Sequence, residues 1–262
     1  GLNMAKTNES TFRNLRRFNL FMGLFHFIQG VLMLILSDLD FKLPVTTSFL
    51  EYDEVTEKLV SNPETAFHLP LALLVAAFLF MSALAHFLIS TPGIYEWYVK
   101  NLKKGANYAR WIEYAFSSSV MIVAIAMLFG MYDIALLLVI FTLNAMMILF
   151  GWMMELHNQT TQKTDWTAFI FGCIAGAVPW IAIFIYFVGS VTSGEQVPNF
   201  VYAIYVSLFI TFNIFAVNMV LQYKKVGRWQ DYLFGEKVYI VLSLVAKSLL
   251  AWQVFFGTLQ PS

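Results

Sequence analysis

The sequence predicts an all-α membrane protein that folds as one bundle of seven transmembrane helices. Of its 262 residues, 59% are hydrophobic and 12% are charged, whereas about a quarter of the residues in a typical soluble domain are charged. A helix needs about 20 apolar residues to cross roughly 30 Å of hydrocarbon. Seven runs of this kind are present, near residues 14–37, 67–90, 106–129, 132–156, 166–190, 199–223 and 236–259.

Polar segments rich in turn residues separate these runs. The first run ends at the long connection 38–66, in which TTSFLEYDEVTE is too polar to cross the bilayer and VTTSF could pair as a short hairpin. The later breaks are STPG at 90–93, FGMYD at 129–133, NQTTQKTD at 158–165, SGEQVPN at 193–199 and KKVGRWQD at 224–231. We therefore expect residues 1–262 to form a single domain.

Lysine and arginine residues predict the orientation, because short cytoplasmic loops carry an excess of both. The outer set of helix ends holds only Lys42 and Lys58. The inner set holds Lys6, Arg13, Arg16, Arg17, Lys100, Lys103, Lys104, Lys163, Lys224, Lys225, Arg228 and Lys237. We expect a multi-pass protein of the cell membrane, surrounded by lipid, with a cytoplasmic amino terminus and an extracellular carboxyl terminus.

Composition disfavours several classes of function. The formal net charge is zero, so no basic surface predicts binding to nucleic acid. The single cysteine, Cys173, cannot form an internal disulfide and is expected to be a small buried hydrophobic side chain. His26 and His86 lie within the first two runs without a third ligand, so we expect no metal site.

Lys247 is the one basic residue deep inside a run, within SLVAKSLLAW at 243–252. An intramembrane lysine costs about 2.5–3.5 kcal/mol on insertion scales and is a functional-site hypothesis by default. Glu113 is the one carboxylate well inside a run. At 1.5 Å per residue both lie about 14–15 Å from the inner basic ends, so they are expected to share a layer of the membrane.

Two interpretations of this pair are open. Lys247 and Glu113 could form a structural ion pair that fixes helix packing, although buried pairs often stabilise little. Alternatively, the desolvated amine could condense with an aldehyde, and Glu113 would be the counterion of the protonated imine. Ser243 lies one turn before Lys247 and could hydrogen-bond either the imine proton or its own helix.

The third run adds a polar face to this pair. In RWIEYAFSSS at 110–119, Arg110 and Glu113 face the same direction, as do Tyr114 and either Ser117 or Ser118 one turn later. This pattern, with a lysine in the seventh run, resembles microbial rhodopsins, in which that lysine carries retinal as a protonated Schiff base.

The sequence is most similar to one branch of these proteins, the heliorhodopsins. The similarity rests on Glu113 as the third-helix acid, on serine rather than aspartate in SLVAK, on histidines in helices one and two, and on the inverted topology. It extends over essentially all seven spans. Pump rhodopsins usually have a tryptophan and a second carboxylate where this chain has Tyr114 and Ser243.

The resemblance implies roles for further polar residues. His26 and His86, near the level of Glu113, would form with bound water a region that receives the imine proton, and Ser82, Asn107 and Arg110 would belong to it. Glu155 would make a polar contact on the cytoplasmic side, although snorkelling or capping is the simpler interpretation. The chromophore is expected to be all-trans retinal in the dark, and family members are dimers.

An apolar slot around the polyene is also implied. Its expected walls are Tyr114, Ser118, Asn144, Met147, Pro179, Trp180, Phe209, Phe212 and Trp252. Such residues also occur in membrane helices as ordinary packing. Pro179 would kink its helix, as expected of a pocket wall or simply of the bundle's shape.

These features favour a light sensor that is not itself an enzyme. Retinal on Lys247 would isomerise in a slow photocycle, and a homodimer would present the change to an unknown cytoplasmic signalling partner. The main alternative is a light-driven proton pump or light-gated ion transporter with the same chromophore. A third possibility is a seven-helix receptor or carrier without a chromophore, in which Lys247 and Glu113 form a structural pair.

Overall fold

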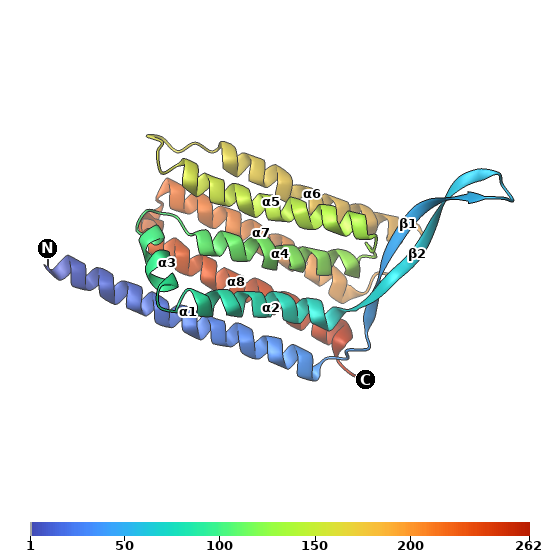
Figure 1. Ribbon diagram of the computed structural model, residues 1–262, viewed down its shortest axis with the longest axis horizontal. Helices are drawn as coiled ribbons and strands as arrows, with labels where there is room; N and C mark the ends of the chain where they lie inside the picture. Colours follow the sequence, from blue (N-terminus) through green and yellow to red (C-terminus); the bar gives the residue numbers. More distant parts are fainter. Residues whose placement is uncertain (1) are drawn as a thin grey trace.

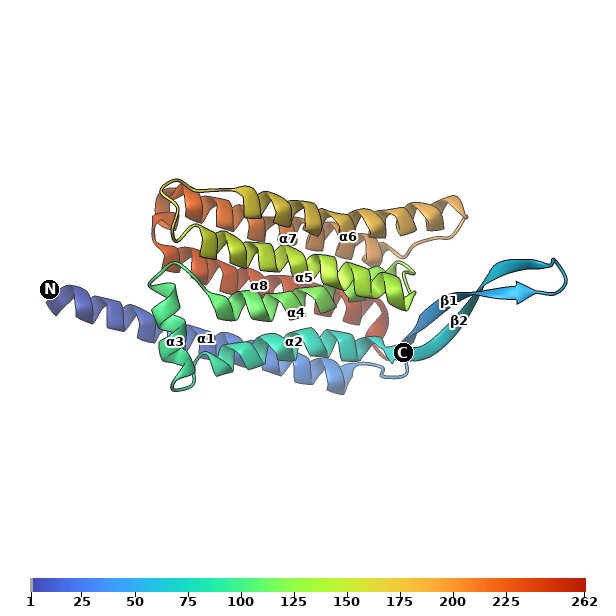
Figure 2. The same ribbon diagram turned by 45° about the horizontal axis from the view of Figure 1, so that its top comes forward.

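The computed structural model describes residues 2–262 and contains a bundle of seven long helices (Figures 1 and 2). Seven helices in this range are long and apolar enough to cross a membrane, as the sequence predicts. They are α1 (Leu2–Leu36), α2 (Leu71–Leu88), α4 (Tyr108–Leu128), α5 (Ile134–His157), α6 (Thr167–Thr192), α7 (Asn199–Lys224) and α8 (Tyr232–Val254), which continues into a π-helical turn, η2 (Phe255–Leu259). The chain is a multi-pass membrane protein.

Local sequence explains where several helices begin. Asn107 caps α4 by accepting a hydrogen bond from the Arg110 amide, and Asp133 caps α5 by accepting from the amides of residues 135 and 136. Asp231 accepts from the Leu233 amide at the start of α8. The residue that follows α7, Lys225, adopts a left-handed conformation with φ of 52°, which ends that helix.

The helices form a ring in chain order. α1 packs on α2 and on α8, α2 on α4, α4 on α5, α5 on α6, and α7 on α8. α6 meets α7 where the Tyr205 hydroxyl donates to the Trp180 carbonyl at 3.1 Å. The core between them contains fully buried side chains such as Phe78, Met121, Ile125 and Leu250. The end that carries the amino terminus is called the inner end below, because the sequence predicts it to be cytoplasmic; the other end is the outer end.

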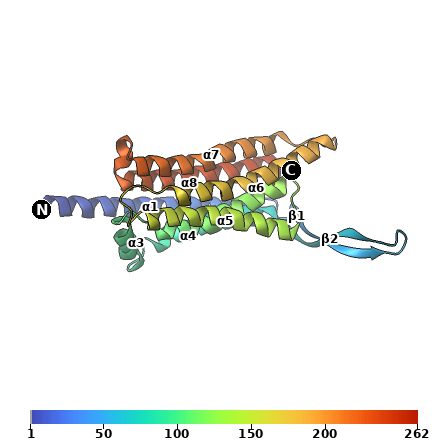
Figure 3. The same cartoon turned by 90° about the horizontal axis from the view of Figure 1, so that it is seen from above.

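Three features differ from the sequence prediction. α1 begins at Leu2 rather than near residue 14 and extends beyond the other helices at the inner end (Figures 1 and 3). A short helix, α3 (Ile94–Leu102), lies across the inner end, and a single 3₁₀ turn, η1 (Gly227–Gln230), links α7 to α8. α3 was missed because nine residues are too few to cross a bilayer.

The third difference is the size of the hairpin in the outer connection. β1 (Lys42–Asp53) pairs antiparallel with β2 (Lys58–Pro70), so the hairpin is much longer than the predicted VTTSF pairing and delays α2 to Leu71. It projects from the outer end of the bundle in all three views. The Thr46 amide donates to the Tyr132 carbonyl at 2.9 Å and fixes the base of the hairpin to the bundle.

Candidate functional site

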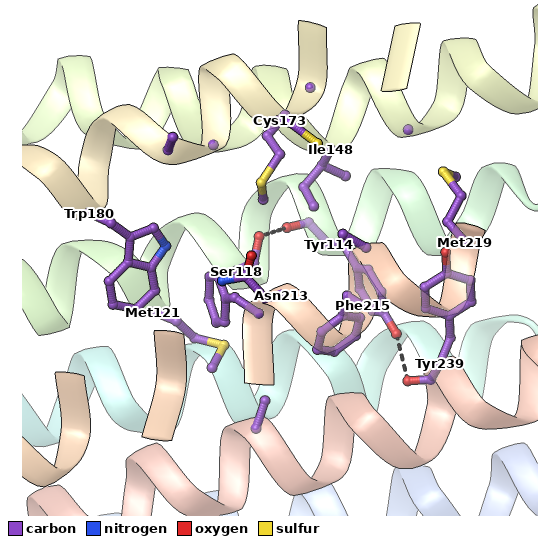
Figure 4. Close-up of a pocket in the computed structure, with 18 of the residues that line it drawn as sticks. Tyr114, Ser118, Met121, Ile148, Cys173, Trp180, Asn213, Phe215, Met219 and Tyr239 are labelled. Carbon is purple, nitrogen blue, oxygen red and sulfur yellow. Dashed lines mark hydrogen bonds between the residues drawn. The ribbon is translucent and has the colours of Figure 1, made fainter. Parts of the chain in front are cut away.

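A mainly apolar cavity of about 270 Å³ lies inside the bundle between α4, α5, α6, α7 and α8 (Figure 4). Aromatic and methionine side chains form most of its wall, and Trp180 and Met219 lie at opposite sides of the view in Figure 4. Such a cavity suits an elongated hydrophobic ligand. Its lining residues with polar groups include Lys247 on α8, Tyr114 and Ser118 on α4, and Asn213 on α7.

Lys247 reaches this cavity from α8 and is 3% exposed. Its Nζ donates a hydrogen bond to Ser243 Oγ at 2.9 Å, which is the contact expected from their one-turn spacing. The same nitrogen lies 5.5 Å from the centre of the Tyr114 ring. The Tyr114 hydroxyl donates to the Tyr239 carbonyl at 3.0 Å and so joins α4 to α8 beside the lysine.

Glu113 is held by two serines. Ser82 on α2 donates to its Oε1, and Ser117, one turn along α4, donates to its Oε2 at 2.7 Å. Among residues 2–262, no salt bridge within 4.0 Å joins Glu113 to Lys247. The direct ion pair considered from the sequence is therefore not formed; Glu113 is bound by Ser82 and Ser117, and Lys247 by Ser243.

The two histidines contact each other, in agreement with the similar depths predicted for them. His26 on α1 and His86 on α2 are both buried, with ring centres 5.3 Å apart. His86 Nδ1 is 2.7 Å from Asn19 Oδ1, a partner that the sequence did not reveal. His26 Nδ1 is bound at 2.7 Å to the Met22 carbonyl of its own helix.

A second, small cavity of about 40 Å³ joins His86 to Glu113. Asn107 and Arg110 also line it, so three of the residues predicted for a proton-accepting region, His86, Asn107 and Arg110, share one space with Glu113. Ser82 does not line this cavity but donates a hydrogen bond to Glu113, which does. His26 packs against the His86 ring. The void is large enough for about three waters, at about 10–15 Å³ each.

The inner end of the bundle contains a buried charged cluster that we call the inner cluster: Arg110, Glu155 and Glu236. Although Arg110 and Glu113 share a face of α4, Arg110 pairs with Glu236 rather than with Glu113. Glu155 is 1% exposed, so it does not snorkel; its Oε1 accepts from the backbone N–H of Asn107 at the start of α4 at 3.0 Å. Sequence reasoning missed Glu236 because it stands beside Lys237 at a predicted helix end, where charges are usually solvated.

The predicted apolar slot is largely the cavity of Figure 4. Asn144, Pro179 and Trp252 do not line it, which corrects the prediction: Asn144 donates to the Ser118 hydroxyl from behind, and Trp252 donates to Gln29 at 2.9 Å. Six of the nine residues do line it: Tyr114, Ser118, Met147, Trp180, Phe209 and Phe212.

Cys173 also departs from expectation. It lines the cavity and is exposed, so it is not the buried side chain that the sequence suggested. The lining residues that sequence reasoning missed include Trp111, Phe215, Met219 and Tyr239. Membrane helices contain many such side chains, and the sequence does not indicate which of them turn inward.

The site fits a retinal chromophore. The cavity offers an apolar wall for a polyene, a buried primary amine for an aldehyde carbon, and a carboxylate on the neighbouring α4 to balance a positive charge. Ser243 already occupies the hydrogen-bonding position beside the amine.

Comparisons with known proteins agree with this geometry. The sequence profile of the heliorhodopsin family matches residues 15–259. A light-driven proton pump from Leptosphaeria maculans has 15% identity and a TM-score of 0.63, covering 92% of this chain and 94% of its own. The transmembrane domain of Salpingoeca rosetta rhodopsin phosphodiesterase has 13% identity and a TM-score of 0.66, covering 98% and 88%. Exiguobacterium sibiricum rhodopsin has 14% identity and a TM-score of 0.59, covering 93% and 96%.

At these identities the solved structures show the fold alone. No curated protein matches the chain. The family profile, however, extends over nearly the whole sequence, including Glu113 and Lys247. The chain therefore belongs to the heliorhodopsin family and is a membrane photoreceptor of the retinal-binding type.

Proposed function

We propose that this protein is a light sensor in which Lys247 attaches all-trans retinal and Glu113 is the counterion. The observation that carries the proposal is the buried Lys247 amine, which opens onto an apolar cavity and has a single hydroxyl partner, Ser243. When bound, retinal supplies a light-driven isomerisation beside a positively charged linkage.

The residues around the amine would control where its proton goes. Ser243 holds the nitrogen at 2.9 Å, and Ser82 and Ser117 fix the two oxygens of Glu113. The small cavity leads from Glu113 to His86, so the imidazole and its water can accept a proton that leaves the amine side. The proton would thus move toward the inner end.

The distribution of charge favours sensing over pumping. Within residues 2–262, the carboxylates well inside the membrane spans are the half-buried Glu113 and the buried Glu155 and Glu236, all at the level of Ser243 or nearer the inner end. On the outer side of Lys247, the polar contacts join neutral groups, as between Gln253 and Ser207 at 3.0 Å. Vectorial transport needs titratable groups on both sides, and this arrangement supplies them on one.

A slow conformational change at the inner end would be the output. Its reader would be a cytoplasmic signalling partner, and the working unit would be a homodimer. The buried charged groups at the inner end are the inner cluster, which ties α4 to α5 and α8. A change of charge in the small cavity would therefore act first on the ion pairs that hold α4, α5 and α8 together.

Illuminated vesicles separate sensing from transport. Purified pigment is reconstituted into lipid vesicles, and external pH is recorded in light with and without an uncoupler, beside the Leptosphaeria maculans pump and the Lys247→Ala variant. We expect the pump alone to give an uncoupler-sensitive pH change. An uncoupler-sensitive signal from this protein, absent from Lys247→Ala, would establish transport and contradict the sensor assignment.

A further inference from the structure

The inner cluster holds two carboxylates and one cation, all buried. Arg110, Glu155 and Glu236 are 6%, 1% and 2% exposed. The guanidinium is paired with Glu236 through Nη2, while its Nη1 stands 4.0 Å from Glu155 Oε2. One guanidinium cannot neutralise two ionised carboxylates, and an unbalanced charge is costly away from water. The composition of the cluster therefore suits it to hold an additional proton.

The surroundings of Glu155 favour its charged form. Its Oε1 accepts hydrogen bonds from the Trp111 indole N–H and from the Asn107 amide at 3.0 Å, and neither of these donors can accept in return. The Tyr232 hydroxyl donates to Oε2 at 2.6 Å. Glu155 does not line the small cavity, so it lies away from the space shared by His86 and Glu113.

Glu236 has different surroundings. It lines the small cavity together with His86, Glu113 and Arg110. Its Oε1 accepts a hydrogen bond from the Tyr98 hydroxyl at 2.8 Å, and a hydroxyl can accept as well as donate, so this contact survives protonation of Glu236 at Oε1. Its Oε2 accepts from the Asn107 side-chain amide at 2.7 Å, and the carbonyl oxygen of the neutral acid can still accept this bond. Burial raises the pKa of Tyr98 to about 12, so the hydroxyl keeps its own proton at neutral pH.

Arg110 provides a second sign that the cavity is a proton site. Its Nε and Nη1 make no hydrogen bond within residues 2–262, although the side chain is more than nine-tenths buried and lines the cavity. Buried donors without a protein partner, on a side chain that lines a cavity, call for an acceptor such as water. Water there would connect Glu236 to Glu113 and His86.

We propose that Glu236 is a proton-exchange group that takes up a proton from the small cavity and, on doing so, releases Arg110 to pair with Glu155. Glu236 pairs with Arg110 from α4 and shares its cavity with four titratable groups, Tyr98 from α3, Glu113 and Tyr114 from α4, and His86 from α2. Glu155 from α5 and Tyr239 from α8 lie on the other contacts of Arg110. The part of the proposal that links this uptake to light rests on the proposed function.

The step is a simple proton transfer. A hydronium in the cavity gives its proton to Glu236 Oε1, an O–H bond forms on the carboxyl group, and a water molecule remains. The neutral acid no longer binds the guanidinium strongly, whereas Glu155, 4.0 Å from Nη1, is still charged. The ion pair then joins α4 to α5 instead of α4 to α8, which converts a proton in the cavity into a change of helix contacts.

Infrared difference spectroscopy of the full chain with retinal tests this directly. A protonated carboxylic acid absorbs in a C=O region that carboxylates leave empty. We expect the light-minus-dark spectrum to contain a positive acid band that is lost in Glu236→Gln and kept in Glu64→Gln, which makes the same change on the exposed hairpin. A band that persists in Glu236→Gln, is lost instead in Glu155→Gln, or is missing from the wild type would overturn the proposal.

Two further measurements keep the test decisive. Tyr98→Phe leaves Glu236 in place but removes its hydrogen-bond partner, so the band should remain and shift in frequency; an unshifted band would contradict the assignment. A chain that never becomes coloured would defeat the proposed function instead. In that case an acid-minus-neutral spectrum recorded in darkness still tests Glu236, because it needs no chromophore, and an acid band equal in Glu236→Gln and wild type would refute the exchange site.

Discussion

Neutralising Glu113 isolates the effect of its charge, because Glu113→Gln keeps the size of the side chain. The amide oxygen can still accept from one serine, and the amide nitrogen can donate to the other, so the contacts with Ser82 and Ser117 need not be lost. The carboxylate lies more than 4.0 Å from the Lys247 nitrogen. At an effective dielectric constant of about 20, its interaction with a positive charge there is below about 4 kcal/mol.

This energy sets the size of the expected spectral change. Light absorption moves positive charge along the polyene away from Lys247, so the counterion stabilises the ground state more than the excited state. Glu113→Gln should therefore shift the absorption maximum to the red by less than about 4 kcal/mol of photon energy. The assay compares purified pigments with Glu195→Gln, which removes a carboxylate from an exposed loop. An unchanged maximum in Glu113→Gln, or an equal shift in the control, would refute the counterion assignment.

Two further predictions follow from the cavities. Replacing His26 and His86 together by phenylalanine should slow loss of the linkage proton in flash photolysis, because their rings meet beside the small cavity; an unchanged rate would remove them from the proton path. Gly176→Ala should lower thermal stability by about 1–3 kcal/mol and slow colour formation on addition of retinal, because the added methyl collides with Met147, which lines the large cavity. Gly189→Ala, in the same helix with open space around it, is the matched control; equal effects of the two changes would contradict the packing argument.

The sequence was sufficient for the parts of the fold that depend on hydrophobic length. Seven apolar runs became seven helices, and the unusual positions of Lys247 and Glu113 were visible because charges deep in such runs are rare. The depths of His26 and His86 also followed from simple counting along helices. Each of these predictions depends on the sequence of one helix alone.

Contacts between helices were harder to predict. Glu236 was missed because rotation about α8, rather than its place in the sequence, turns its side chain toward Arg110. The expected Lys247–Glu113 pair is not formed: Lys247 contacts Ser243, and Glu113 contacts Ser117. A partner one turn away on the same helix competes with one on another helix. Trp252 likewise turns to Gln29 on α1 instead of toward the cavity. Such choices depend on the packing of the whole bundle.

The most direct test of the account is an absorption spectrum of the purified chain after addition of all-trans retinal, recorded beside Lys247→Ala. The buried amine at the cavity predicts a visible band in the wild type that hydroxylamine bleaches in light, and no such band in the variant. A wild-type protein that stays colourless, or a variant that forms the same band, would contradict the attachment of retinal at Lys247.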